Sequence, residues 1–454
     1  MNIILKKVVI ILISLIFVIT IIVPCINSNS NIIINKNNSI ERVSFNPFIE
    51  GWKYRKQITI DHTKVAGNLN NFPVLVSNID PDLASKAQAD GNDILFMTDI
   101  GEAEQLFHEI EFFDNSTGEL VAWVNIPSIF NSIDIVFYMY YGNPDCSSYE
   151  ISERIWDSNY QAVWHLSEDE TDLRHDSTIN IRHATPYNYD GDEATNDGII
   201  GGADEFDGIN DHLRTGVSFD YDFRTISFWI KTDVKPLSDP NAILSQNADT
   251  LKYGLLYANI QSDGLHAKAG GEGAGEEFIF DIDLNSWYMV QLIRDHLITK
   301  YYINGILVDT GDSGNLGSVW NPNPNLVIGS SREYDRLFEG ILDEVRVSDI
   351  ARSSGWILTE YNNQNNPSSF LSFGVEEIGL KSTFIIGSFE DIHTEGNSMI
   401  IDALNIRCIQ TSPFAFVPYT SNEKLIISKD GYIGLLIFLP ITKFIIAICN
   451  MDAF

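Results

Sequence analysis

The chain has 454 residues, of which 62 are Asp or Glu and 29 are Lys or Arg, so its formal net charge is −33. A body this acidic repels phosphate backbones and anionic lipid headgroups, which excludes generic nucleic-acid binding and attachment to membranes through a basic patch. Hydrophobic residues make up 44% and charged residues 20%. This is the balance of a folded protein, and the length predicts about two or three domains.

The chain begins with a segment that has the parts of a secretory signal. Lys6 and Lys7 precede an apolar run from Val8 to Val23, and polar residues follow at once. This pattern predicts export. The run is long for a cleaved signal and shorter than the ~20 residues that cross a bilayer comfortably, so cleavage and retention as an anchor both stay open. We expect an extracellular or cell-surface protein that touches the membrane only through residues 1–28, if these are retained.

From residue 48 onward the sequence has the pattern of β-strands. Short runs rich in β-branched and aromatic residues are bounded by Gly, Pro, Asn or Asp, and long amphipathic helices are scarce. Asn304-Gly305, between two such runs, is a strong signal for a two-residue hairpin. The pattern predicts an all-β protein made of antiparallel β-sandwiches. Composition divides the chain into an Asn-rich linker (29–47), a first sandwich (48–150), a second sandwich (155–375) and a small C-terminal β-module (380–454).

Ordered sequence blocks run through the first sandwich. They are Gly51-Trp52-Lys53-Tyr54-Arg55-Lys56, Asn71-Phe72-Pro73-Val74, Asp90-Gly91-Asn92-Asp93-Ile94, His108-Glu109-Ile110-Glu111, Leu120-Val121-Ala122-Trp123-Val124 and Tyr140-Tyr141-Gly142-Asn143-Pro144. Together they resemble a prokaryotic domain of unknown function that is found in exported surface proteins. That family has no settled activity, so the resemblance identifies a module without supplying a mechanism.

A second series of landmarks runs through residues 160–350. It comprises Val163-Trp164-His165-Leu166, Asp176-Ser177-Thr178, Glu205-Phe206-Asp207-Gly208, Ile226-Ser227-Phe228-Trp229-Ile230, Tyr302-Ile303-Asn304-Gly305 and Gly340-Ile341-Leu342-Asp343-Glu344-Val345-Arg346-Val347. In this order they resemble a laminin-G-like, concanavalin A-like jelly roll. The resemblance implies two packed antiparallel sheets and a role in binding glycans or protein partners.

The same resemblance implies one structural calcium ion, near the meeting of the first and last strands. By position, its ligands would be Asp176, Asn180 and Asp343, which offer the oxygen atoms that calcium prefers. The sequence departs from the family pattern at Ile179, where glycine is usual, and a bulky residue opposes the turn that would offer carbonyl oxygens. The alternative interpretation makes Asp176 a turn former and Asp343 a solvent-exposed charge at a strand end.

Catalytic motifs are few. Glu109 and Glu111 alternate along one predicted strand, as the two carboxylates of a glycoside hydrolase do. They belong, however, to a recurring block of the first module. The favoured interpretation is therefore a solvated strand face. His165, beside Trp164, is interpreted as a strand residue rather than a metal ligand. Serine-hydrolase, phosphate-binding and dinucleotide motifs are absent. The sequence therefore favours a non-catalytic protein.

Aromatic residues make up 11% of the chain, and exposed aromatic faces can stack on the apolar faces of sugar rings. Trp320, among Asn and Pro residues, is the candidate platform. We therefore expect an exported recognition protein that binds extracellular glycan or a surface protein, in adhesion or capture. The alternatives are a glycoside hydrolase or an accessory module of one, and a structural envelope component. Paired carboxylates in a cleft would favour the enzyme. An exposed aromatic shelf would favour the lectin, and a featureless surface would favour the structural role.

Overall fold

The computed structural model describes residues 47–98, 104–169, 172–218, 223–237, 241–246, 256–268, 277–312, 325–331, 334 and 336–379, together with four strand segments. These segments are β1 (Ile32–Ile34), β2 (Ile40–Arg42), β25 (Phe389–Glu395) and β26 (Ser398–Leu404), which form two antiparallel pairs, β1 with β2 and β25 with β26. The predicted export segment lies outside the described residues, as does most of the C-terminal module. Within the described part of the chain, no helix is long and apolar enough to cross a membrane. Two compact units are distinguished, and both sandwiches belong to the larger one, residues 46–100 with 104–454.

The first module is a sandwich of two antiparallel sheets, with the strand orders β24–β3–β8–β5 and β4–β7–β6. The strands are β3 (Tyr54–Ile60), β4 (Leu69–Ile79), β5 (Leu95–Met97), β6 (His108–Asp114), β7 (Glu119–Ile129), β8 (Ile135–Tyr141) and β24 (Leu371–Ile378). Short helices are α2 (Pro47–Glu50), η1 (His62–Lys64), α3 (Pro81–Lys86) and η2 (Ser152–Arg154). Phe72, Trp123 and Phe137 are among the buried side chains that join the two sheets in one hydrophobic core.

The sequence blocks that carry the first resemblance meet in this fold. The indole nitrogen of Trp52 donates to the carbonyl of Asp93 at 2.6 Å, and the Asp93 carboxylate accepts the backbone N–H groups of Gly142 and Asn143 at 2.6 and 2.8 Å. Gly142 has a φ of +84°, and a Cβ there would lie 2.5 Å from the Tyr54 ring. These blocks therefore hold the module together, because buried backbone donors need such acceptors.

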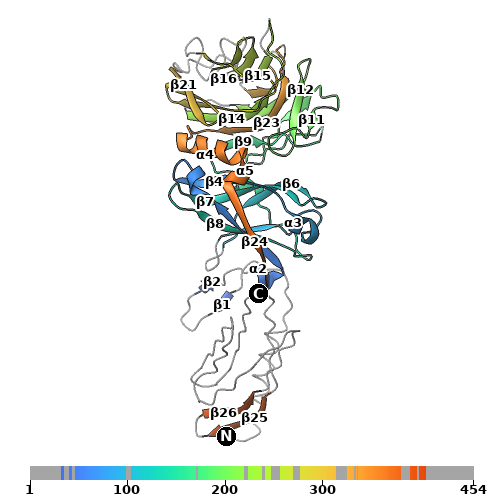
Figure 1. The fold of residues 1–454 in the computed structure, drawn as a ribbon, viewed down its shortest axis with the longest axis vertical. Helices are drawn as coiled ribbons and strands as arrows, with labels where there is room; N and C mark the ends of the chain where they lie inside the picture. The colour runs from blue at the N-terminus through green and yellow to red at the C-terminus, as the bar shows by residue number, and fades with distance from the viewer. Residues whose placement is uncertain are drawn as a thin grey trace. The chain divides into compact units, whose positions relative to one another are not determined.

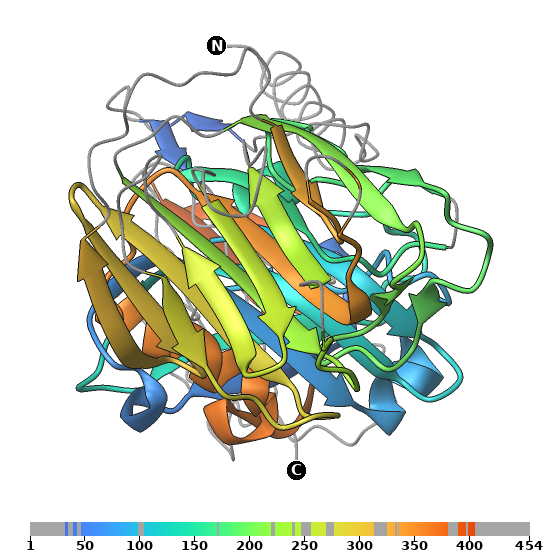
Figure 2. The ribbon, with the colours of Figure 1, turned by 90° about the horizontal axis from the view of Figure 1, so that it is seen from above.

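The second module is a larger sandwich, with a seven-stranded sheet in the order β10–β13–β22–β15–β16–β17–β18 and an eight-stranded sheet in the order β11–β12–β23–β14–β19–β20–β21, with β9 beside β23. The strands are β9 (Tyr160–Trp164), β10 (Thr185–Tyr187), β11 (Ala194–Thr195), β12 (Ala203–Asp207), β13 (His212–Ser218), β14 (Phe223–Lys231), β15 (Asn241–Gln246), β16 (Leu256–Gln261), β17 (Gly264–Lys268), β18 (Phe278–Phe280), β19 (Tyr288–Asp295), β20 (Ile298–Ile303), β21 (Ile306–Asp312), β22 (Asn325–Ile328) and β23 (Glu339–Ser348). Every described pairing is antiparallel, so the predicted all-β fold with a jelly roll is confirmed (Figure 2). Asn304 and Gly305, with φ of 51° and 74°, make the predicted hairpin between β20 and β21.

After the second module the chain returns to the first. Helix α4 (Ser354–Asn365) and the short α5 (Pro367–Phe370) lie between the modules (Figure 1), and β24 then pairs with β3 in the four-stranded sheet. The predicted boundary at residue 375 therefore falls inside a strand of the first module. A boundary drawn from composition assumes that each domain is continuous in sequence, and it cannot detect a strand that returns.

Helix α4 begins at the Ser353 cap, whose hydroxyl oxygen accepts the N–H of Trp356, and ends before Asn366-Pro367, where proline cannot continue a helix. It is buried on two sides. Trp356 packs edge-on against Phe72 of the first module, with ring centroids 4.9 Å apart. On the other side, Gln364 accepts the indole N–H of Trp229, on β14, at 2.6 Å. Helix α4 therefore covers the outer face of the eight-stranded sheet.

Candidate functional site

Four charged side chains are buried together where the two modules meet. Glu109 and Glu111 come from β6 of the first module, His165 directly follows β9, and Glu344 lies on β23. His165 Nδ1 lies 2.7 Å from Glu344 Oε1 and 3.4 Å from Glu111 Oε2, while its Nε2 lies 3.7 Å from Glu109 Oε2. The side chains of His165, Glu111 and Glu344 are at most 6% exposed. The imidazole is therefore surrounded by carboxylates from both modules. We call these four residues the inter-module cluster.

An irregularity in β23 directs two consecutive acids to the same side. The register between β14 and β23 shifts by one residue beside Glu344, which has a left-handed backbone with a φ of 55°. Leu342 and Val345 consequently both face the sandwich core, although three positions separate them. Asp343 and Glu344 both leave the core, as expected at a β-bulge.

A second layer of contacts fixes Glu344. The Arg346 guanidinium donates to Glu344 Oε2 at 3.0 Å through Nε and to Glu360 Oε1, on α4, at 3.2 Å. It also lies over the rings of Trp123 and Trp156, 4.2 and 4.8 Å from their centroids. Charge pairing and stacking on aromatic rings suit a buried arginine, because its guanidinium is planar and weakly hydrated.

The charges of the cluster follow from burial and from the neighbouring groups. Burial raises the pKa of Glu111 to about 8 and raises that of Asp343 well above its ordinary value. Burial lowers the pKa of His165, but the carboxylates of Glu344 and Glu111 outweigh this effect, and the pKa lies well above 6.5. At neutral pH a protonated His165 therefore faces an ionised Glu344, and the pKa of Glu111 lies near neutrality instead of near 4.5.

Two sequence interpretations are wrong at this place. Glu111 does not lie on a solvated strand face, since its side chain is 2% exposed, and Trp123 Nε1 donates to its Oε2 at 2.9 Å. Asp343 is not an exposed charge at a strand end, because it is fully buried. Both interpretations treated an acidic residue as exposed because nothing in the local sequence indicates the distant segment that covers it. For Glu111 that segment is in the second module, and for Asp343 it includes Ile199 and Ile200. The carboxylates of Glu111 and Glu344 lie in the module contact, with side chains at most 2% exposed, and that of Glu109 is 16% exposed.

The three residues predicted to bind calcium are used in other ways. The Asp176 carboxylate accepts backbone N–H groups from Val163, Thr178 and Arg182 at 2.7 to 3.0 Å. Asn180 donates to the carbonyl of Tyr160 at 3.0 Å. Asp343 Oδ2 accepts the N–H groups of Ile199 and Ile200, and its Oδ1 has no hydrogen-bond partner within the described residues.

This arrangement does not fit a calcium ion shared by the three side chains, because the oxygens of Asp176 already serve backbone donors. Among the described residues, the groups of acidic and histidine side chains whose ligand atoms lie within 4.8 Å of one another include neither Asp176 nor Asp343. Those groups are Asp61 with His62 and Asp134, Glu111 with His165 and Glu344, and Asp190 with Asp192 and Glu193. Calcium binding stays a prediction, with no support from the geometry of these three side chains. Trp320, the predicted aromatic platform, lies outside the described residues.

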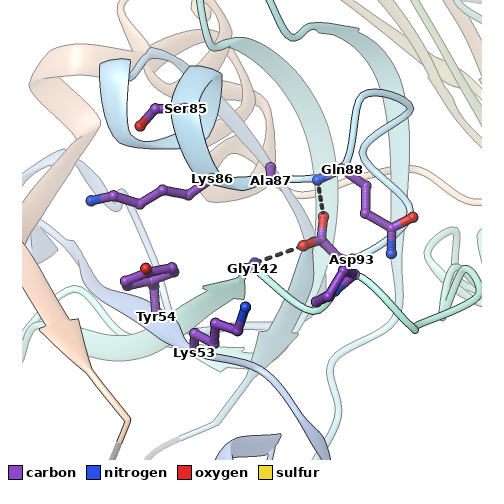
Figure 3. A pocket seen from close by; sticks show the side chains of 9 residues that line it. Lys53, Tyr54, Ser85, Lys86, Ala87, Gln88, Asp93 and Gly142 are labelled. Carbon is purple, nitrogen blue, oxygen red and sulfur yellow. Dashed lines mark hydrogen bonds between the residues drawn. The ribbon is translucent and has the colours of Figure 1, made fainter.

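A pocket of about 270 Å³ opens in the first module, between α3 and the Gly142 turn (Figure 3). Its charged lining is largely paired within the protein. The Asp93 carboxylate accepts the N–H groups of Gln88 and Gly142, as the dashed lines in Figure 3 show. The ammonium group of Lys86 pairs with Asp82 and Glu376 at 2.7 and 2.6 Å. We assign no chemistry to this pocket.

Exposed aromatic side chains gather at one end of the seven-stranded sheet. Tyr187 ends β10, and Tyr334 lies in the turn that follows β22. The two side chains are 38% and 40% exposed, and the guanidinium carbon of Arg214, on β13, lies 3.7 Å from the centroid of the Tyr187 ring and 4.2 Å from that of the Tyr334 ring. We call Tyr187, Arg214, Tyr334 and the adjoining His212 the Tyr–Arg–Tyr site.

The Tyr–Arg–Tyr site lies on the outer face of its sheet. Leu213 belongs to the core, so its neighbours His212 and Arg214 point away from it. Tyr187 is the cross-strand partner of His212, and their rings stack with centroids 5.3 Å apart. Because α4 and the first module cover the other sheet, this face is on the far side of the sandwich from the module contact. No local sequence pattern indicates this site, since its residues belong to three separate segments of the chain.

Comparisons with known proteins agree with this architecture. Residues 207–358 match the family described as the concanavalin A-like lectin/glucanases superfamily, and residues 90–176 match a domain of unknown function, DUF2341. Both resemblances stated from the sequence are thereby confirmed. The chain thus contains a fold shared by lectins and glucanases, next to a module without an assigned activity. No curated protein matches the chain.

Several solved structures are similar to part of the chain at low identity and low TM-score. Domain 4 of AbnA, a GH43 extracellular arabinanase from Geobacillus stearothermophilus solved with arabinotriose, is 20% identical, with 45% of this chain and 98% of that chain covered and a TM-score of 0.35. The receptor binding domain of botulinum neurotoxin D is 16% identical, with 45% and 53% covered and a TM-score of 0.36. The binding domain of Paraclostridial Mosquitocidal Protein 1 is 16% identical, with 45% and 52% covered and a TM-score of 0.36. The matches thus span about half of these two binding domains.

Proposed function

We propose that this protein is an exported recognition protein whose second module binds extracellular glycan, in adhesion or capture at the cell surface. The observation that carries the proposal is the Tyr–Arg–Tyr site, where two exposed phenol rings flank an arginine on the outer face of a lectin-type sandwich. Aromatic faces pack against the apolar C–H faces of sugar rings, while neighbouring polar groups bind the hydroxyls. An exposed aromatic shelf is the feature expected of a glycan-binding surface.

The module contact also supports recognition rather than hydrolysis. A glycoside hydrolase needs two carboxylates flanking a bound sugar, and the carboxylates of Glu109 and Glu111 instead face His165 inside the protein. The side chains of the inter-module cluster connect the two modules. Export and surface location are part of the proposal and rest on the N-terminal segment, residues 1–28.

The test is a glycan array probed with the full-length protein, followed by titration of each glycan that binds. We expect binding to a defined set of glycans and a loss of at least tenfold in affinity for Tyr187→Ala and for Tyr334→Ala. Phe112→Ala is the matched control, because Phe112 is 45% exposed on the first module and lies outside the proposed site. Absence of binding to every glycan, or equal losses in Tyr187→Ala and the control, would overturn the proposal.

A further inference from the structure

The arginine of the Tyr–Arg–Tyr site is held in one orientation by its neighbours. Tyr187 and Tyr334 contact its guanidinium through their rings, and its Nε donates to His212 Nε2 at 3.2 Å. Burial lowers the pKa of His212, so the ring is neutral at pH 7. Its Nδ1 lies 3.0 Å from the carbonyl of Asn210 and donates to it, which leaves Nε2 as the acceptor for Arg214. Three neighbours thus fix the guanidinium.

Among the described residues, no hydrogen-bond acceptor is recorded for the two terminal nitrogens of Arg214. Within the described residues no carboxylate pairs with Arg214, whose contacts are those with Tyr187, Tyr334 and His212. Other buried arginines do pair with acids, as Arg174, Arg346 and Arg352 show. Arg214 is partly exposed, and its terminal nitrogens are not among the buried polar atoms that lack a partner, so they can be reached by solvent.

The backbone supports the same surface at an energetic cost. Tyr334 has a φ of 58°, and Asn188, which follows Tyr187, has a φ of 63°. A left-handed conformation is uncommon for a bulky residue such as tyrosine and costs about 1 kcal/mol or more. The turn nevertheless places the Tyr334 ring against Arg214 and exposes 40% of its side chain. The strained backbone of Tyr334 therefore keeps its ring at the surface of the protein and not in the hydrophobic core.

We propose that the Tyr–Arg–Tyr site binds an acidic sugar, with Arg214 donating two parallel hydrogen bonds to a carboxylate or sulfate oxygen pair while Tyr187 and Tyr334 pack against the sugar ring. A fixed, planar guanidinium suits such an anion, because both N–H groups on its outer edge point the same way. Because the Arg214 guanidinium is already held in one orientation, less conformational entropy is lost when the anion binds. This inference rests on the proposed glycan-binding function and specifies the class of glycan.

The net charge of −33 limits the kind of anion that can bind. At about 0.1 M salt, charges more than ~10 Å apart are largely screened, so an anion bound at Arg214 is affected mainly by the acids closest to it, such as Asp211 beside His212. A densely charged polymer that must follow the surface would meet the remaining acids. The site therefore fits an isolated acidic sugar within a chain, which agrees with the exclusion of nucleic acid.

The experiment compares acidic oligosaccharides with their neutral counterparts on the full-length protein. The probes are oligogalacturonates, sialylated oligosaccharides and sulfated galacto-oligosaccharides, each beside the same sugar after carboxyl reduction or desulfation. We expect at least one acidic probe to bind tenfold or more tightly than its neutral counterpart, and Arg214→Gln to abolish that preference. Arg154→Gln is the matched control, because Arg154 also lies over an aromatic ring, that of Phe107, on the other module.

The outcomes separate this inference from the function on which it rests. Binding of neutral and acidic probes with equal affinity, unchanged in Arg214→Gln, would overturn the acidic specificity and leave glycan binding standing. Binding of no glycan at all would overturn both. Arg214→Lys supplies a second check, because lysine keeps the charge without the planar fork. An affinity in Arg214→Lys equal to that of the unaltered protein would contradict the proposed pair of hydrogen bonds.

Discussion

Glu111 of the first module and His165 of the second face each other across the module contact, with Oε2 3.4 Å from Nδ1. Both side chains are almost completely buried, and Glu344 approaches the same Nδ1 to 2.7 Å. A buried ion pair needs a complete set of partners, because each charge has lost its hydration. The relative placement of the modules therefore depends on a few buried charges, and substitutions at these positions test it.

Glu344→Gln is expected to destabilise the protein by about 3 kcal/mol, because it leaves Arg346 and His165 buried with an incomplete set of partners. The measurement is the free energy of unfolding in urea, followed by tryptophan fluorescence. Glu205→Gln, an exposed glutamate on β12, removes the same charge and should change stability by less than about 0.5 kcal/mol. Similar values for the two variants would contradict the role assigned to Glu344.

The pH dependence of stability should depend on Glu111. Its pKa is about 8 in the folded protein and near 4.5 ordinarily, mainly because of burial. Between these pH values the folded chain keeps a proton that the unfolded chain releases, so stability falls as the pH rises from about 4.5 to 8. His165 acts in the same direction, because its pKa is also raised. Glu109 and Glu344 face the same imidazole.

Melting temperatures measured from pH 5 to 9 for Glu111→Gln should therefore show a flatter curve than those of the unaltered protein. The glutamine still offers an oxygen to the indole of Trp123. Glu104→Gln serves as the control, because Glu104 is exposed on the same module. Parallel curves for the unaltered protein and Glu111→Gln would show that Glu111 does not keep its proton in the folded state.

The features that the sequence predicted are local ones. Asn304 and Gly305 adopt the positive φ angles that a two-residue hairpin demands, and such a turn depends on two adjacent residues. The alternation that predicts strands is likewise a property of short segments. The family resemblance added the jelly roll, because its landmarks are spread over the whole second module in one order.

The features that the sequence did not predict depend on distant segments. Strand β24 pairs with β3, more than 300 positions earlier in the chain, and no local pattern indicates this pairing. Glu111 and Asp343 are acidic residues of the kind expected on an exposed strand face, but distant segments of the chain bury both. The Tyr–Arg–Tyr site combines residues from three segments, and its rings acquire their arrangement only when β10 pairs with β13.

Asp176 offers a test of the calcium prediction. Asp176→Ala removes the acceptor for the N–H groups of Val163, Thr178 and Arg182, and unpaired buried donors cost about 1–3 kcal/mol each. We expect a lower melting temperature for the variant, by the same amount in calcium and in a chelator. The chelator could instead lower the melting temperature of the unaltered protein to that of Asp176→Ala. This result would support calcium binding at this loop.

Asn363 of helix α4 completes an edge strand of the first module. Its Oδ1 accepts the N–H of Leu75 at 2.7 Å, and its Nδ2 donates to the carbonyl of Leu75 at 3.1 Å. Leu75 lies on β4, at the edge of the three-stranded sheet. An edge strand has backbone groups that no neighbouring strand pairs, and the side-chain amide supplies both missing partners. Asn363→Ala therefore leaves a buried donor and a buried acceptor unpaired.

We expect Asn363→Ala to lower the free energy of unfolding by about 1–3 kcal/mol and the two modules to unfold together, because α4 packs on both. Calorimetry should give one heat-absorption peak for the two modules, shifted to lower temperature in the variant. Asn365→Ala, at an exposed position near the end of the same helix, keeps the Leu75 contacts and should melt as the unaltered protein does. Two separate peaks in the unaltered protein, one for each module, would show that α4 and the inter-module cluster do not couple them.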